Sequence, residues 1–130
     1  SPPRELSIDA LAATLQRHLD ALRPDPPIYG EARRPRTLVR ADRDAAEGGP
    51  LCAVHVLGGT RLSIDLNPWH WLAEHARAAA SGPEGLAWLL LAVYAEVNRL
   101  LDDVTSEHEE AMQRAVADAL LAGELRPVLA

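Results

Sequence analysis

The stretch that decides the fold reads Leu51-Cys52-Ala53-Val54-His55-Val56-Leu57, then Gly58-Gly59, then Thr60-Arg61-Leu62-Ser63-Ile64-Asp65-Leu66. Two apolar, β-branched runs joined by two glycines predict a β-hairpin with a two-residue turn. Such a turn pairs Leu57 with Thr60 and fixes which residues share a face. The predicted core face then carries Leu51, Ala53, His55, Leu57, Leu62, Ile64 and Leu66. The opposite face is half apolar, because Cys52, Val54 and Val56 fall on it.

Upstream of the hairpin, the sequence predicts one helix, one loop and one strand. Ser7 is a helix N-cap residue, and Leu6 and Leu11 are placed to form a hydrophobic staple across it. Prolines from position 24 onward end this helix. Residues 23–36 are rich in Pro and Arg and predict a surface loop, and Thr37 to Ala41 predict a short strand.

Downstream, three helices are predicted. Asn67-Pro68 is a helix start, followed by a helix over 69–80 with Trp69 facing inward. A second, apolar nearly all round, runs from Pro83 to about Val104, and a third runs from Ser106 to a stop at Gly123. The order predicts a single α+β domain over 1–130, with an N-terminal helix, a small antiparallel three-stranded sheet, and three helices on one sheet face.

Composition excludes several classes of protein. The 130 residues are 48% hydrophobic and 25% charged, which argues against a disordered or fibrous chain. No run reaches the roughly 18 apolar residues of a membrane span, and the start lacks a secretory signal pattern, so we expect a cytoplasmic protein. All basic residues are Arg and Phe is absent, a bias that favours a bacterial genome rich in G+C.

Charge narrows the class of ligand. The net charge is −6, carried by residues 51–130, which disfavours nucleic acid. Guanidinium groups bind carboxylates and phosphates in a bidentate manner. We therefore expect Arg33, Arg34 and Arg36, with Arg61, to bind an acidic ligand or segment.

Three residues could serve acid–base chemistry. The predicted register buries His55 on the apolar face, where desolvation would keep the ring neutral. Such a ring is either a core histidine hydrogen-bonded to the backbone or to a Tyr, or a general base. His70 and Glu74 lie four residues apart on one helical face. The histidine spacing does not fit the helical zinc motifs, and the lone Cys52 cannot form a thiolate cluster, so no metal and no cofactor are expected.

Two functional hypotheses follow. The first is an accessory protein, a homodimer that binds a peptide or protein partner, with Trp69 and Trp71 among its binding residues. It depends on the apolar helix after Pro83, on the half-apolar outer sheet face and on the clustered tryptophans. The second is a small cofactor-free enzyme of a biosynthetic pathway that uses His55, His70 and Glu74. The sequence does not identify the substrate or partner.

Overall fold

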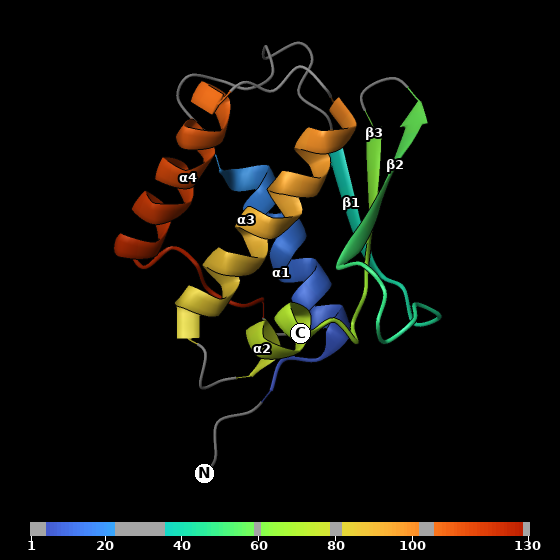
Figure 1. The fold of residues 1–130 in the computed structure, drawn as a ribbon. Helices are drawn as coiled ribbons and strands as arrows, with labels where there is room; N and C mark the ends of the chain where they lie inside the picture. Colours follow the sequence, from blue (N-terminus) through green and yellow to red (C-terminus); the bar gives the residue numbers. More distant parts are fainter. Residues whose placement is uncertain (1–4, 23–35, 59–60, 79–81, 102–105, 129–130) are drawn as a thin grey trace.

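The fold was analysed in a computed structural model that describes residues 5–22, 36–58, 61–78, 82–101 and 106–128 (Figure 1). Four helices and three strands follow one another along the chain. Their bounds are α1 (Ile8–Ala21), β1 (Arg36–Ala41), β2 (Cys52–Gly58), β3 (Arg61–Leu66), α2 (Trp71–Arg77), α3 (Gly82–Leu101) and α4 (Ser106–Leu121). The α+β class and the order of elements predicted from the sequence are confirmed.

The sheet is mixed, so the prediction of a purely antiparallel sheet is wrong. The strand order is β1-β3-β2, with β3 antiparallel to β2 and parallel to β1. Strands β1 and β2 therefore do not pair with each other. The segment after β1 passes the end of β3 before β2 begins, which leaves room for β3 between the two outer strands.

Asn67 holds this crossing segment in place. Its side chain is 1% exposed, and its Nδ2 donates to the carbonyl oxygens of Ala46 at 2.9 Å and Pro50 at 3.1 Å. Its Oδ1 accepts from the N–H of Trp69 at 2.9 Å. Asn67 was predicted as a helix N-cap, but α2 begins only at Trp71, with His70 at the N-cap position. Trp69, predicted to face inward, is 42% exposed.

The hairpin is confirmed, but its predicted register is wrong by one residue. Strand β2 pairs Val54 with Ile64 and His55 with Ser63, and pairing is irregular between Val56 and Gly58. Gly58 has a φ of 105°, a value that glycine adopts without strain, and it pairs with Arg61 as the last pair of the strand. A slip of one residue moves every side chain to the other face. Cys52 and Val54 therefore face the helices, and His55 lies on the outer face.

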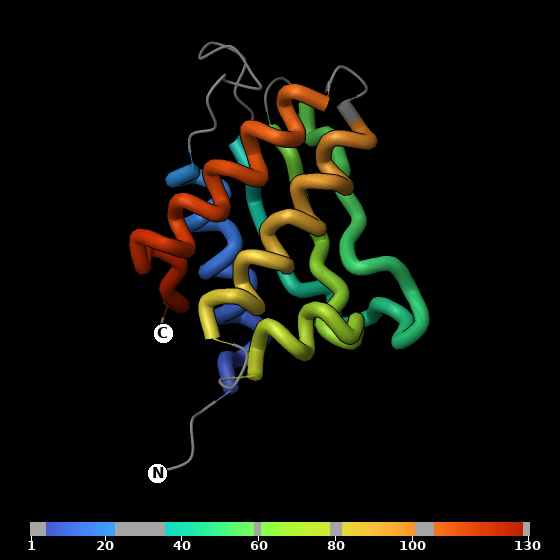
Figure 2. The backbone as a smooth tube through the Cα atoms, turned by 60° about the vertical axis from the view of Figure 1, so that its left-hand side comes forward, coloured from blue at the N-terminus to red at the C-terminus, as the bar shows by residue number. Residues whose placement is uncertain are grey.

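The helices lie on one side of the sheet (Figures 1 and 2). Helix α1 packs on β1, α3 packs on β2 and also contacts α1, α2 and α4, and α4 packs on α3. The centre of the core is fully buried and comprises Leu11, Leu15, Ile64, Leu66, Leu89, Leu90 and Val93. The apolar character of α3 is thus explained by its central place among the other helices.

Two other helix ends follow the sequence signals. Ser7 Oγ accepts from the N–H of Ala10 at 3.0 Å, as expected of an N-cap. Gly123, with a φ of 72°, ends α4, where its N–H donates to the carbonyl oxygen of Leu120. No helix in the described ranges combines the length and hydropathy needed to cross a membrane.

Candidate functional site

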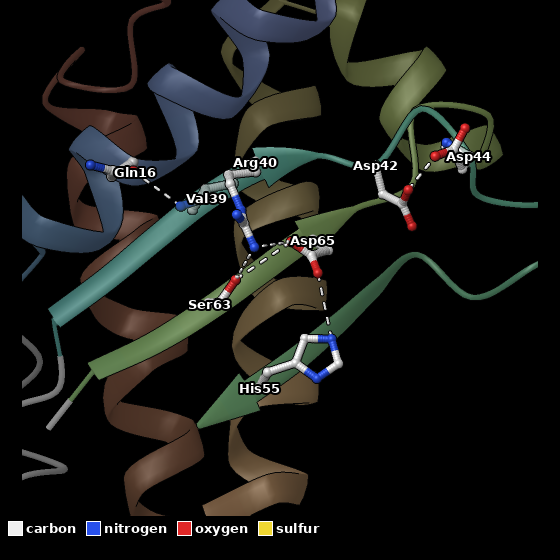
Figure 3. A network of polar contacts seen from close by, with 8 residues as sticks. All are labelled: Gln16, Val39, Arg40, Asp42, Asp44, His55, Ser63 and Asp65. Carbon is white, nitrogen blue, oxygen red and sulfur yellow. Dashed lines mark hydrogen bonds and ion pairs between the residues drawn. The ribbon is translucent and has the colours of Figure 1, made fainter. Parts of the chain in front are cut away.

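A polar cluster lies on the outer face of the sheet, the face away from the helices (Figure 3). Asp65 on the central strand β3 contacts the other three members of the cluster, Arg40, His55 and Ser63. One carboxylate oxygen accepts from Arg40 Nη2 at 3.3 Å, and the other lies 3.5 Å from His55 Nε2. Ser63 Oγ accepts from the same Arg40 nitrogen at 3.1 Å and lies 3.5 Å from Asp65 Oδ1. The three strands thus bring together an Arg, a His, a Ser and an Asp.

The arrangement of this cluster does not match a nucleophilic triad. In such a triad the histidine takes the proton of the serine hydroxyl and donates a hydrogen bond to the aspartate, which stays ionised. Here, within the described part of the chain, His55 contacts Asp65, whereas the Ser63 hydroxyl bonds to Arg40 and Asp65. The His55 side chain is 58% exposed, so the predicted burial of this ring is wrong. The cause is the one-residue shift in the hairpin register.

Two of the predicted arginines come together on this face. Arg36 begins β1 and Arg61 begins β3, and the parallel register places them side by side. Both are exposed. Arg33 and Arg34 lie outside the described residues. Among the described strand residues, the outer face therefore carries Arg36, Arg61 and Arg40 and one acid, Asp65.

The other two predicted catalytic residues lie at α2. His70 Nδ1 accepts from the N–H of Leu72 at 3.1 Å, so this ring caps the helix. Glu74 is exposed in the same helix. Within the described residues, the structure shows no contact of His55 with either of them, and no cluster of three or more His, Cys, Asp or Glu that could hold a metal ion.

All three tryptophans of the chain are exposed. Trp69 is 42%, Trp71 is 64% and Trp88 is 61% exposed. The ring of His75, one helical turn after Trp71, lies 6.4 Å from that of Trp88 on α3, and the ring of His70 lies 5.7 Å from that of Trp71. We name Trp71, His75 and Trp88 the tryptophan surface. Trp is highly buried on average, so the exposure of Trp71 and Trp88 is unusual for this residue type.

Sequence reasoning identified Trp71 but missed His75 and Trp88. The buried positions of α3, at Leu86, Leu89, Leu90 and Val93, leave position 88 outside the buried stripe. That spacing could have marked Trp88 as exposed. Its proximity to His75 depends on the packing of α2 against α3, which local sequence does not encode.

Two hollows lie elsewhere on the molecule. One of about 580 Å³ lies between α1 and β1, where Gln16, Asp20 and Val39 are among its lining residues. The other, of about 170 Å³, lies between α3 and α4 and is lined in part by Tyr94, Asn98 and Met112. Neither hollow contains His55, His70, Glu74 or a tryptophan. The tryptophan surface is therefore not part of these hollows, whereas Arg40 of the polar cluster lines the hollow between α1 and β1.

Comparisons of the chain with protein-family models, with curated proteins and with solved structures gave no match.

Proposed function

We propose that this chain is an accessory protein of the bacterial cytoplasm that binds a partner protein through the tryptophan surface. The observation that carries the proposal is the exposure of Trp71 and Trp88 by more than 60% each, on two helices that pack together. Tryptophan is the residue type most enriched among the energetic centres of protein interfaces.

In the sequence, the apolar helix after Pro83 and the half-apolar outer sheet face also suggested an interaction protein. The structure removes the support of both features for this hypothesis. Helix α3 is covered by its own chain, and Cys52 and Val54 face the helices. The tryptophans, by contrast, are exposed and are not part of the buried core. Their indole rings are available to a partner without any rearrangement of the core.

Charges around the tryptophan surface define the chemistry of the partner. Glu74 lies one turn after Trp71, and Glu84 lies one turn before Trp88. Both glutamates are exposed. An apolar segment flanked by Arg or Lys would pack on the indole rings, place its cations on their faces and pair with these acids. We therefore propose a partner segment that is apolar and basic.

Affinity capture from an extract of the producing cells tests this proposal. The bait is compared with the double variant Trp71→Ala/Trp88→Ala and with the control Leu121→Ala, which removes an apolar side chain that is 86% exposed on α4. We expect a protein retained by wild type and by Leu121→Ala, but bound at least about 100-fold more weakly by the double variant. Equal retention by all three baits would contradict the proposal.

A cofactor-free enzyme is the second candidate, favoured by the His55–Asp65 pair on the outer face. A carboxylate beside an imidazole can orient the ring for proton transfer. Because His55 is exposed, His55→Gln is expected to preserve the fold and to abolish any turnover of an acidic substrate held by Arg36 and Arg61. Turnover that survives His55→Gln would exclude this role for His55.

A further inference from the structure

The two edges of the sheet differ in how they are protected. At the β1 edge, the N–H of Val39 donates to Gln16 Oε1 of α1 at 3.0 Å. Thr37 Oγ1 donates to Asp20 Oδ1 of the same helix at 3.4 Å. The Gln16 side chain thus occupies a backbone donor of this edge, and α1 covers it, which blocks the addition of another strand.

At the β2 edge, some backbone N–H and C=O groups point away from β3 and form no hydrogen bond within the sheet. The N–H of Asn67 donates to the carbonyl oxygen of Leu51 at 2.7 Å, so the polar groups of Leu51 face the β3 side. In an antiparallel pair, successive residues direct these groups to opposite sides. Cys52, Val54 and Val56 therefore direct their N–H and C=O groups outward, and no other described residue bonds to them.

Apart from His55, the side chains of the β2 edge are apolar. Residues 51–58 contain no Asp, Glu, Lys or Arg. Val56 is 58% and Leu57 is 54% exposed. The nearby charges of Glu96 and Arg99 on α3 pair with each other at 2.6 Å. An unguarded apolar edge of this kind is a template for another strand.

We propose that the β2 edge pairs with the β2 edge of a second copy of this chain, antiparallel about a two-fold axis at Val54. The axis sets Val54 opposite Val54 and Cys52 opposite Val56 of the second copy, so that every outward N–H and C=O of these residues finds a partner. The small Ala53 then lies opposite His55 of the second copy and leaves room for its ring.

A second copy fits this edge because the edge is complementary to itself. The chain carries a net charge of −6, but none of that charge lies in the strand that would meet its counterpart. The pairing makes one continuous sheet with the helices of both copies on the same side. The tryptophan surface is not used, so each dimer would present it twice.

Sedimentation equilibrium of the wild-type chain between micromolar and millimolar concentrations tests this proposal. We expect a monomer–dimer equilibrium whose dissociation constant rises at least tenfold in Val56→Lys. A charged lysine on an edge strand disfavours pairing with another strand. The matched control is Leu38→Lys, at an exposed position of the guarded strand β1, which should leave the constant unchanged. Circular dichroism should show both variants folded, since both side chains are exposed.

Disulfide formation tests the register independently of any effect of lysine. In the proposed dimer, Ala53 and His55 of the second copy form a non-hydrogen-bonded pair, with Cα atoms about 4.5 Å apart. A mixture of Ala53→Cys and His55→Cys chains should form a disulfide-linked dimer faster than either variant alone, as such a pair suits a disulfide.

Three results would overturn the inference. They are a wild-type chain that stays monomeric at millimolar concentration, a dimer unaffected by Val56→Lys, and a dimer that Trp88→Ala dissociates. Partner capture by Val56→Lys separates this inference from the proposed function, because that variant keeps the tryptophan surface intact.

Discussion

At the scale of single residues, His18 on α1 forms a hydrogen bond to the segment that follows α4. The imidazole is 5% exposed, and its Nε2 donates to the carbonyl oxygen of Arg126 at 2.9 Å. Nearby, the N–H of Val128 donates to Thr14 Oγ1 at 2.8 Å. Burial lowers the pKa of His18 below its ordinary value of 6.5, partly opposed by the hydrogen bond to Arg126, and Arg17 lowers it further. The folded chain therefore favours the neutral ring.

This lowered pKa predicts a loss of stability in mild acid. The unfolded chain binds a proton at His18 more readily than the folded chain, so the free energy of unfolding falls as the pH drops below about 6.5. The contribution is fully present above that pH and is lost as the pH falls through the lowered pKa. Urea unfolding between about pH 7.5 and about pH 5 measures this effect.

The control for His18 is His18→Gln, which keeps a side-chain N–H near Arg126 but does not titrate. We expect this variant to show a smaller decline in stability over the same pH range, because residue 18 no longer titrates. If wild type and His18→Gln decline equally, His18 does not contribute to the acid sensitivity.

Cys52 is expected to be chemically inert in the folded chain. It is 5% exposed, and burial, together with Glu96, raises the pKa of its thiol to about 12, against a smaller lowering effect of Arg99. The thiolate is the reactive form, so a disulfide reagent near pH 8 should label the native chain orders of magnitude more slowly than the chain in urea. Labelling of the native chain at the unfolded rate would show that Cys52 is accessible.

At the scale of elements, the crossing segment between β1 and β2 depends on Asn67. Asn67→Ala removes the hydrogen bonds that a buried amide donates to the carbonyls of Ala46 and Pro50 and the one it accepts from Trp69, and we expect a loss of about 2–3 kcal/mol of unfolding free energy. Asn67→Asp keeps the acceptor for Trp69 but turns an oxygen toward the Ala46 and Pro50 carbonyls, so it should destabilise at least as much. Chemical denaturation measures both variants, and a loss below about 0.5 kcal/mol would refute this role.

The sequence predicted the existence of the helices and strands correctly, but it did not predict the strand register or the parallel pairing of β1 with β3. Ser7 and Gly123 marked the ends of two helices because capping is local chemistry. The hairpin was also evident, but both faces of β2 are apolar, so alternation could not select between two registers. The parallel pairing of β1 with β3 depends on the path of the crossing segment, which is fixed by the buried contacts of Asn67.

At the scale of the whole molecule, the candidate binding residues are brought together by packing between elements. Trp69 and Trp71 were recognised from their clustering in the sequence, whereas Trp88 lies beside His75 only because α2 packs on α3. Arg36 and Arg61, far apart in the chain, become neighbours through the same parallel pairing that the sequence did not reveal. Within the described residues, His55 lies on the outer face of the sheet and makes no contact with His70 or Glu74.

Tryptophan fluorescence should report the exposure of all three indole rings. Because each ring is more than 40% exposed, we expect an emission maximum close to that of indole in water and ready quenching by acrylamide. Unfolding in urea should then shift the maximum only slightly. A strongly blue-shifted native emission that moves to the red on unfolding would mean that the rings are buried in solution.

If the partner segment is basic and apolar, its affinity for this chain should fall as the salt concentration rises. Glu74 and Glu84 are exposed, so their attraction to partner cations is screened as the ionic strength rises. In Glu74→Gln/Glu84→Gln we expect weaker binding at low salt and a smaller dependence on salt, with the fold unchanged. Titration of the captured partner by calorimetry at two salt concentrations measures both quantities. A salt dependence identical to wild type would show that the partner does not contact these acids.

The most direct test of a binding function is photo-crosslinking from the tryptophan surface. A photoreactive phenylalanine analogue replaces Trp88 in one preparation and Leu121 in another, and both are irradiated in extract of the producing cells. We expect position 88 alone to give a discrete adduct with a second, different protein, and this adduct should disappear when Trp71→Ala is added. No adduct at position 88, the same adduct from position 121, or an adduct with a second copy of this chain would contradict the proposed function.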